Sequence, residues 1–177
     1  MATTTTFPEV RISTDRLTIR EFAPEDAPGV GEVIAAQEWE ALPPGVPRAT
    51  ITLPRWLRDD VHRFRDAGHG VHLAVQHNAD GVHIGAMSLF NTDWKRGCTE
   101  VGFGLRAGWR GRGYATEALL ALTGWALSAG AMRRIELLTA PGNAAARLVA
   151  EKTGYAYKGI VPDPRTGDDM LLFHRSR

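Results

Sequence analysis

Hydrophobic and polar residues alternate most regularly over residues 99–105, and a helical pattern follows after a short turn. Val101, Phe103 and Leu105 alternate with Glu100 and two glycines, which predicts a strand with one buried face. Between residues 115 and 126, apolar side chains recur at spacings of three and four residues, so they share one face of a helix. We therefore expect a strand, a turn and a helix in succession over residues 99–127, at the centre of the fold.

The alternation typical of strands and the three- to four-residue spacing typical of helices also occur in the rest of the chain. Further strands are predicted at residues 16–22, 70–76, 82–90, 133–139, 155–160 and 170–174, and further helices at 24–37, from 52 onward and at 143–153. Consecutive strands with one strand–helix–strand crossover predict the α/β class with a mixed, mostly antiparallel sheet, not a doubly wound one. Residues 1–13 show neither period, so we expect a flexible N-terminal arm followed by a single domain over residues 14–177.

The composition is that of an ordinary globular protein. The chain has 177 residues, of which 44% are hydrophobic and 23% charged, enough for one domain with a sizeable core. No apolar run is long enough to span a membrane, and the first residues lack the basic and apolar segments of a signal peptide. Cys98 is the only cysteine, which excludes an intrachain disulfide, and together these features favour a cytoplasmic protein without a membrane partner.

The charges are unevenly distributed along the chain. The formal net charge of +1 argues against nucleic acid as a partner. Residues 1–97 carry 10 Lys/Arg and 13 Asp/Glu, a net charge of −3. Residues 98–177 carry 11 Lys/Arg and 7 Asp/Glu, a net charge of +4. This asymmetry suits an anionic ligand bound by the C-terminal half and a cationic acceptor nearer the N-terminal half.

The turn at residues 106–113 combines three glycines with three arginines. The first N–H groups of a helix have no partner within the helix, and the helix dipole adds positive charge there. Glycines let a ligand approach the backbone closely, so the turn predicts an anion site. Neither common phosphate template fits, because Tyr114 stands where a P-loop needs lysine and Thr116 stands where the dinucleotide fingerprint needs its last glycine.

A third pattern does fit the turn. The segment from Arg110 to Ala115 reads Arg-Gly-Arg-Gly-Tyr-Ala, in which Arg or Gln is followed by two residues, Gly, one residue, and Gly or Ala. With this motif the chain resembles the GNAT superfamily of acyl-CoA-dependent N-acyltransferases, and most of all its branch of ribosomal-protein N-terminal (alanine) acetyltransferases. Asp15-Arg16-Leu17 and the segment from Asn143 to Tyr155 extend the resemblance over residues 14–175.

The resemblance implies a GNAT-like fold and direct transfer of an acetyl group from acetyl-CoA to a primary amine, without a metal. The turn would hold the coenzyme A pyrophosphate. The strand before it would splay away from the next strand, lie beside the pantetheine arm and supply the N–H group that polarises the thioester carbonyl. The cofactor-binding residues implied in this way are Phe103, Gly104, Leu105, Arg106, Arg110, Gly111, Arg112, Gly113, Tyr114, Ala115, Asn143 and Arg147.

The predicted strand also carries a candidate base. Glu100 lies on the face opposite the hydrophobic side chains, and the resemblance makes it the group that takes the amine proton, often through water. An amine with a pKa of about 10 is mostly protonated at neutral pH, so a base or a water wire is required. Asp93 and Glu117 are alternatives, although a carboxylate at Glu117 is favoured by the helix dipole in any case.

The group that protonates the leaving thiolate is less well defined. Asn143 opens the later helix as an N-cap, and the resemblance implies that it also bonds the pantetheine arm. Ala146 and Ala150 occupy the positions at which family members carry Ser and Tyr, and neither alanine can donate a proton. Tyr155 lies nearby but matches a core aromatic residue of the family, so water or the departing ammonium would supply the proton.

No residue pattern specifies the acceptor. The loops 39–47 and 163–169 are expected to border its site, with Trp39, Asp93 and Trp94 as candidate contacts. The acceptor implied is a protein N-terminus or a small-molecule amine, bound by a monomer or a homodimer. A non-catalytic acyl-CoA-binding sensor or interaction module of the same fold is the alternative, and the two alanines favour it.

Overall fold

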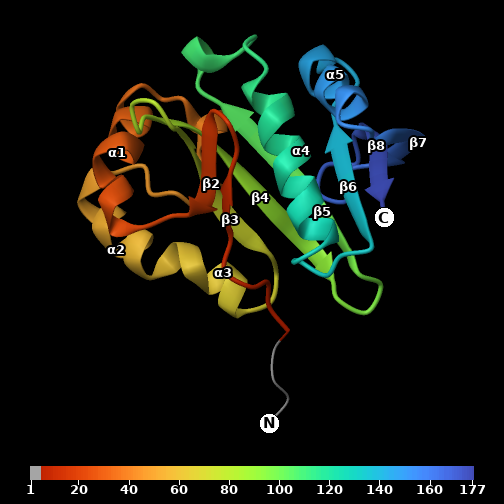
Figure 1. Cartoon of the computed structure of the whole chain (residues 1–177), viewed down its shortest axis with the longest axis horizontal. Helices are drawn as coiled ribbons and strands as arrows, with labels where there is room; N and C mark the ends of the chain where they lie inside the picture. Colours follow the sequence, from red (N-terminus) through yellow and green to blue (C-terminus); the bar gives the residue numbers. More distant parts are fainter. Residues whose placement is uncertain (1–4) are drawn as a thin grey trace.

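An eight-stranded sheet runs through the computed structural model, which describes residues 5–177 (Figure 1). The strands are β1 Arg11–Ser13, β2 Leu17–Glu21, β3 Val71–His77, β4 His83–Asp93, β5 Cys98–Leu105, β6 Arg134–Thr139, β7 Ala156–Pro162 and β8 Asp169–Ser176. The α-helices are α1 Ala27–Ala35, α2 Leu53–Arg58, α3 Arg63–Asp66, α4 Tyr114–Leu127 and α5 Ala144–Lys152.

The strands lie in the order β1-β2-β3-β4-β5-β6-β8-β7. Within the described sheet, neighbouring strands are antiparallel except β5 and β6, which are parallel and are joined by the crossover through α4. The predicted class, a mixed α/β fold with a mostly antiparallel sheet and one crossover, is confirmed.

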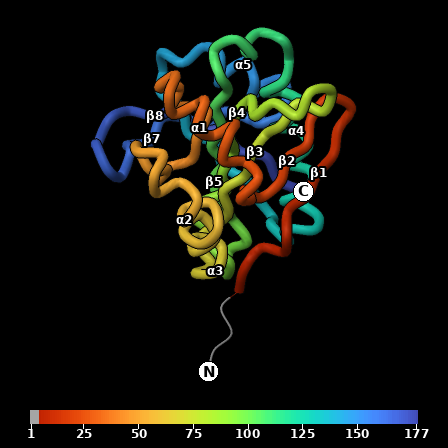
Figure 2. The backbone as a smooth tube through the Cα atoms, turned by 90° about the vertical axis from the view of Figure 1, so that its left-hand side faces the viewer, coloured from red at the N-terminus to blue at the C-terminus, as the bar shows by residue number. Residues whose placement is uncertain are grey.

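Helices cover both faces of the sheet because its central strands are apolar on both sides. In β3, Leu73 and Val75 belong to a buried cluster that includes the apolar face of α4, whereas Ala74 between them belongs to a second cluster with α1 and α2. Figure 1 accordingly shows α1–α3 on one side of the sheet and α4 lying across the other, and Figure 2 views the molecule from the side that carries α1–α3.

The prediction of a flexible arm is wrong for residues 5–13. Phe7 is 2% exposed, and its ring centroid lies 4.7 Å from that of Trp94 and 6.0 Å from that of Trp125. β1 then pairs with β2 in an antiparallel manner. A strand of three residues is too short to show a period, and the aromatic partners of Phe7 are remote in the sequence. Residues 1–4 of the predicted arm lie outside the described residues.

The helix predicted from residue 52 onward is divided into α2 and α3. The backbone leaves helical geometry at Asp59, with φ −122° and ψ −56°. In the break, Asp60 forms ion pairs with Arg55 at 3.7 Å and with Arg63 at 3.2 Å, so one carboxylate joins the two halves. The loop predicted at 39–47 also contains a short 3₁₀ helix, Trp39–Ala41, which lies against β5.

Candidate functional site

The parallel strands β5 and β6 separate after three residues. They pair at Cys98–Glu100 with Arg134–Glu136, and over residues 101–105 the edge of β5 that faces β6 has no strand partner in the described sheet. β6 continues instead beside β8 up to Thr139. Backbone N–H and C=O groups on such an open edge need partners, which a bound ligand can provide. We call the point of separation the fork.

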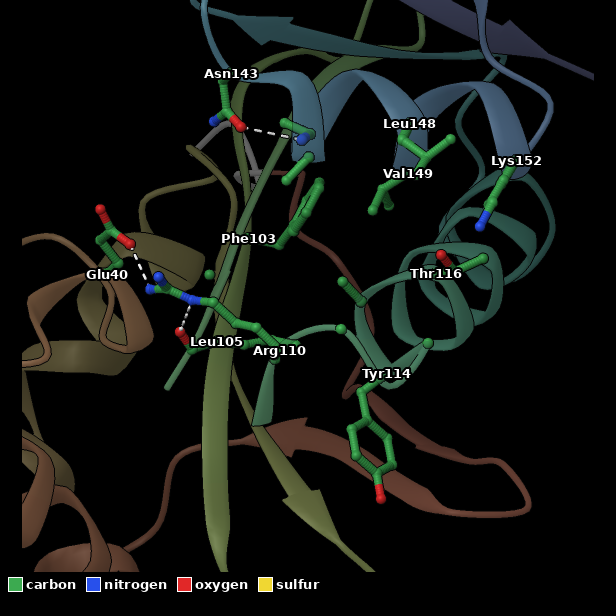
Figure 3. A pocket seen from close by; sticks show the side chains of 16 residues that line it. Glu40, Phe103, Leu105, Arg110, Tyr114, Thr116, Asn143, Leu148, Val149 and Lys152 are labelled. Carbon is green, nitrogen blue, oxygen red and sulfur yellow. Dashed lines mark hydrogen bonds and ion pairs between the residues drawn. The ribbon is translucent and has the colours of Figure 1, made fainter. Parts of the chain in front are cut away.

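A cavity of about 600 Å³ occupies the opening beyond the fork, between β5, the start of α4 and α5 (Figure 3). Its volume is in the range of small-molecule sites, about 300–1,000 Å³. The predicted cofactor-binding residues that line it are Phe103, Gly104, Leu105, Arg110, Gly111, Gly113, Tyr114, Ala115 and Asn143. The lining residues that the sequence analysis did not predict are Glu40, Thr116, Ala145, Ala146, Leu148, Val149 and Lys152.

The turn before α4 presents unbonded N–H groups to this cavity. Gly111 and Gly113 have left-handed backbone, with φ of 72° and 81°, which glycine adopts without strain. No protein atom of the described chain accepts a hydrogen bond from the N–H groups of residues 111–115. A Cβ atom at Gly111 would meet nothing within 4 Å, so the space beside it is open. The arrangement is that of an anion site at the positive end of a helix.

Arg110 fixes the start of the turn. Its Nε donates to the carbonyl of Leu105 at 3.0 Å, and its Nη2 pairs with Glu40 at 2.6 Å (Figure 3). The 3₁₀ helix that carries Glu40 lies close to β5, because a Cβ atom at Gly104 would lie 1.8 Å from the Glu40 carbonyl oxygen. Glycine at position 104 therefore lets the backbone of the 39–41 helix approach β5 closely. This contact places the helix at the end of β5.

Arg106 also links the end of β5 to the segment that precedes the 39–41 helix. Its Nε donates to Glu38 at 2.7 Å, and Glu38 also accepts from the N–H of Ala107 at 2.9 Å. The hydrogen bond from Arg106 lowers the pKa of Glu38, which keeps this carboxylate ionised. The Arg106 side chain is committed to this clamp and does not line the cavity.

The side chains of three further residues predicted to bind the coenzyme do not contact the cavity. Arg112 lies with its guanidinium 5.6 Å from the centroid of the Trp109 ring, and neither Arg112 nor the exposed Arg147 is among the cavity-lining residues. Tyr114 faces the cavity with its backbone, while its ring points away and its hydroxyl lies 3.2 Å from Nε2 of His77 (Figure 3). The two arginines contribute positive charge near the cavity, but their side chains do not contact it.

The first turns of α5 form the opposite wall. Asn143 accepts a hydrogen bond from the N–H of Ala146 at 3.0 Å, which confirms its predicted N-cap role. The residues of α5 that face the cavity include Ala145, Leu148, Val149 and Lys152. Their spacing of three, four and seven residues is the helical period, so this face could have been found from the sequence.

Glu100 lies at the fork and is not among the residues that line the cavity. Side chains alternate along a strand, so Glu100 shares a face with Gly104, which adjoins the 39–41 helix, and not with Phe103. Its register partners are Phe90 of β4 and Glu136 of β6.

A bulge in β4 aims a polar side chain at Glu100. The register shifts after Phe90, and Asn91 in the shifted segment has left-handed backbone with φ 50°. Its Nδ2 donates to Oε2 of Glu100 at 2.9 Å. Burial raises the pKa of Glu100, and the nearby Glu136 carboxylate acts in the same direction, against the opposing hydrogen bond from Asn91. A carboxylate with a raised pKa is a stronger base, which suits the predicted role.

None of the three residues considered for the acid supplies a proton to the cavity. Ala146 lies on the cavity wall and Ala150 is fully buried. Tyr155 is also buried, its hydroxyl lies 2.7 Å from Oγ1 of Thr123, and burial raises its pKa to about 12. Tyr155 therefore packs in the core, as the sequence analysis expects.

The three predicted acceptor contacts lie in different surroundings. Trp94 donates from Nε1 to the carbonyl of Gly68 at 2.8 Å and packs on Phe7, so this partly buried side chain lies against the core. Asp93 ends β4 and accepts from the N–H of Arg96 at 2.9 Å, and from its register partner Cys98 the strand β5 runs about 17 Å to Phe103 in the cavity wall. Trp39 lies beside Glu40 in the 3₁₀ helix, with the Arg48 guanidinium 4.7 Å from its ring centroid, and stays close to the site.

Residues 5–177 contain no group of three or more His, Cys, Asp and Glu side chains that could hold a metal ion. In the same range, no helix has the length and apolar character needed to cross a bilayer.

Comparisons with known proteins agree with this geometry. Residues 16–156 match the family model described as an acetyltransferase (GNAT) domain. The chain is 26% identical over 159 residues to Bacillus subtilis YdaF, provisionally named a ribosomal N-acetyltransferase, and the match covers 84% of this chain and 82% of YdaF.

Two solved structures share the fold. The ribosomal-protein-S5-alanine acetyltransferase of Vibrio fischeri superposes with a TM-score of 0.78 at 16% identity, covering 95% of this chain and 97% of that one. RimL, a ribosomal L7/L12 alpha-N-protein acetyltransferase solved with coenzyme A, superposes with a TM-score of 0.77 at 16% identity, covering 94% and 98%. The resemblance to the ribosomal-protein branch that the sequence analysis states is confirmed by these neighbours.

Proposed function

The chain belongs to the GNAT acetyltransferase family, and on this premise we propose that it transfers the acetyl group of acetyl-CoA directly to a primary amine. The observation that carries the proposal is the cavity at the fork, which joins an open strand edge to a turn of unbonded N–H groups. An open strand edge suits the amide groups of a pantetheine arm, and the turn suits a pyrophosphate.

In the proposed complex, each part of the coenzyme meets its own set of lining residues. The pyrophosphate lies on the N–H groups of residues 111–115, and the pantetheine arm lies between β5 and α5, where Asn143 can bond it. Lys152, at the far end of the α5 wall, supplies a positive charge for a further phosphate. Leu148 is 50% exposed without a ligand, and it would be covered by the bound coenzyme.

The reaction needs the two faces of β5. The thioester is held at the open edge over residues 101–105, where a backbone N–H polarises its carbonyl. The amine approaches from the face that carries Glu100, which takes one proton as the nitrogen bonds to the carbonyl carbon. The carbon–sulfur bond then breaks, and the thiolate takes a proton from water or from the protonated nitrogen of the tetrahedral intermediate, since Ala146 and Ala150 provide none. The products are an N-acetylated amine and coenzyme A.

The acceptor enters beside the 39–41 helix, on the Glu100 face of β5. The names of the relatives favour a protein N-terminal amine as the first candidate, and a small-molecule amine is the alternative.

A second candidate function is a non-catalytic acyl-CoA-binding module. The specific observation in its favour is that Ala146 lies on the cavity wall and Ala150 in the core, where family members carry proton donors. Such a module would bind acetyl-CoA through the same turn but would not turn it over.

Turnover with a panel of amines separates the two functions. We expect acetyl-CoA to be consumed in the presence of at least one member of a panel of peptides with free N-termini, aminoglycosides and polyamines, with a matching mass increase in that amine. N-terminally blocked versions of the same peptides are the control. Tight acetyl-CoA binding without consumption across the whole panel would favour the module.

A further inference from the structure

We propose that Arg16, in the link between β1 and β2, is a positioning residue for the pyrophosphate turn. Its guanidinium joins the carbonyl of Arg112 in the turn to the carboxylate of Glu117 in α4, and this link directs the N–H groups of the turn toward the ligand. The inference rests on the proposed function and adds a residue that does not itself line the cavity.

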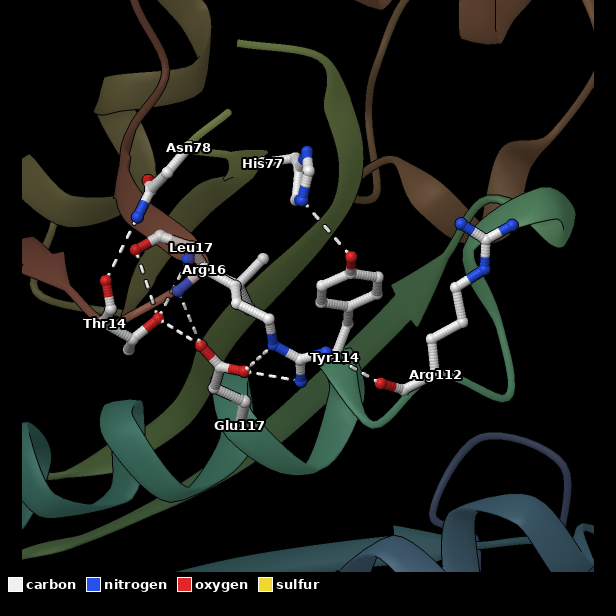
Figure 4. Close-up of polar contacts among 8 residues, drawn as sticks. All are labelled: Thr14, Arg16, Leu17, His77, Asn78, Arg112, Tyr114 and Glu117. Carbon is white, nitrogen blue, oxygen red and sulfur yellow. Dashed lines mark hydrogen bonds and ion pairs between the residues drawn. The ribbon is translucent and has the colours of Figure 1, made fainter. Parts of the chain in front are cut away.

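The contacts come from both ends of one guanidinium (Figure 4). Nη1 of Arg16 donates to the carbonyl oxygen of Arg112 at 3.0 Å. Nε donates to Oε2 of Glu117 at 2.6 Å, and Nη2 lies 2.6 Å from the same oxygen. A planar fork of donors can satisfy both partners at once, which a single ammonium group cannot do.

The held carbonyl determines where the next N–H points. In a trans peptide the C=O and the N–H of the following residue lie in one plane and point in opposite directions. Because the Arg112 carbonyl points to Arg16, outside the cavity, the N–H of Gly113 points away from Arg16. Gly113 itself lines the cavity, so this N–H is directed to the proposed pyrophosphate.

The guanidinium is itself held in place. It lies 4.3 Å from the centroid of the Tyr114 ring, and a Cβ atom at Gly113 would lie 3.4 Å from its Nη2. The Tyr114 hydroxyl lies 3.2 Å from Nε2 of His77, which fixes the ring from behind (Figure 4). Arg16 thus fills the space beneath the turn, on the side away from the ligand.

Glu117 connects the turn to the start of the chain through more than one bond. Oε1 accepts from Oγ1 of Thr14 at 2.6 Å and from the N–H of Arg16 at 3.1 Å. Burial opposes ionisation of Glu117, but the hydrogen bonds from Thr14 and Arg16 outweigh it and lower the pKa. This network commits Glu117 to positioning, which argues against the alternative that Glu117 is the base.

The test compares two acetyl donors in the Arg16→Lys variant. Acetyl-CoA uses the turn, whereas acetyl-pantetheine carries the same thioester and lacks the pyrophosphate. We expect KM for acetyl-CoA to rise about tenfold, the usual scale for losing a hydrogen bond to a charged group, while kcat and the KM for acetyl-pantetheine stay within about twofold. Glu117→Gln should show the same donor-dependent pattern with a smaller change.

Arg20→Lys is the matched control. Arg20 lies in β2 and holds Asp26 through two hydrogen bonds of 2.9 and 2.6 Å, away from the turn. Its replacement tests general destabilisation, and both KM values should stay unchanged. The proposal is overturned if Arg16→Lys raises the KM for both donors equally, or leaves both unchanged. If wild-type protein fails to bind coenzyme A, the proposed function fails and not only the role of Arg16.

Discussion

Replacing Gly111 by aspartate should abolish acetyl-CoA binding in a protein that still folds. Gly111 has left-handed backbone and open space where its Cβ would be, so an aspartate there projects a carboxylate into the proposed pyrophosphate site. Two like charges about 4 Å apart repel by about 4 kcal/mol at a protein surface, so the dissociation constant should rise at least about a hundredfold. Titration calorimetry measures the effect directly.

Gly111→Asn is the matched control for this variant. Asparagine has nearly the same size as aspartate and tolerates left-handed backbone equally well, but it carries no charge. We expect it to bind acetyl-CoA within about tenfold of wild type, since a backbone strain of about 1 kcal/mol is all that it adds. Equal losses in both variants would mean that steric blockage or misfolding, and not an anion, explains the result.

Glu100→Gln should separate catalysis from binding. Glutamine keeps the size of the side chain and can still interact with Asn91, but it cannot take a proton. A positioned general base contributes about 10²–10⁴-fold, so turnover at pH 7 should fall by that factor while acetyl-CoA affinity is unchanged. Glu136→Gln, at the register partner on β6, removes a carboxylate of the same size and should retain most activity.

The pH dependence follows from the raised pKa of Glu100. Burial disfavours its ionised form, so the wild-type rate should rise with pH through a pKa above the usual glutamate range, and this limb should vanish in Glu100→Gln. In a folded state with a raised carboxyl pKa, stability is lost as pH rises through that pKa, so the variant should melt no lower than wild type at pH 7. An undiminished rate at pH 7 would remove Glu100 from the mechanism.

The strongest sequence predictions concern residues whose neighbours lie close along the chain. β5, the turn and α4 were predictable because alternation, glycine spacing and helical period all act within a few residues. The N-cap role of Asn143 follows from the same local chemistry. The open edge of β5 was implied by the family resemblance and not by any pattern in the strand itself.

The errors concern contacts between distant segments. Trp94 lies in a predicted loop, but Phe7 and the carbonyl of Gly68 hold its side chain against the core. Arg106 lies in the basic turn, but its partner Glu38 comes from a different part of the chain. The β4 bulge that aims Asn91 at Glu100 has no local sequence signature, because a shift in register is a property of two strands together.

Acetyl-CoA binding in the cavity beyond the fork is tested by the melting temperature of the wild-type protein with and without this ligand. A ligand at about 100 times its dissociation constant adds about 2.7 kcal/mol to the free energy of unfolding. For a chain of this size the melting temperature shifts by about 2–4 °C per kcal/mol, so we expect a rise of several degrees that grows with ligand concentration. An unchanged melting temperature at millimolar acetyl-CoA would mean that the cavity does not bind this ligand.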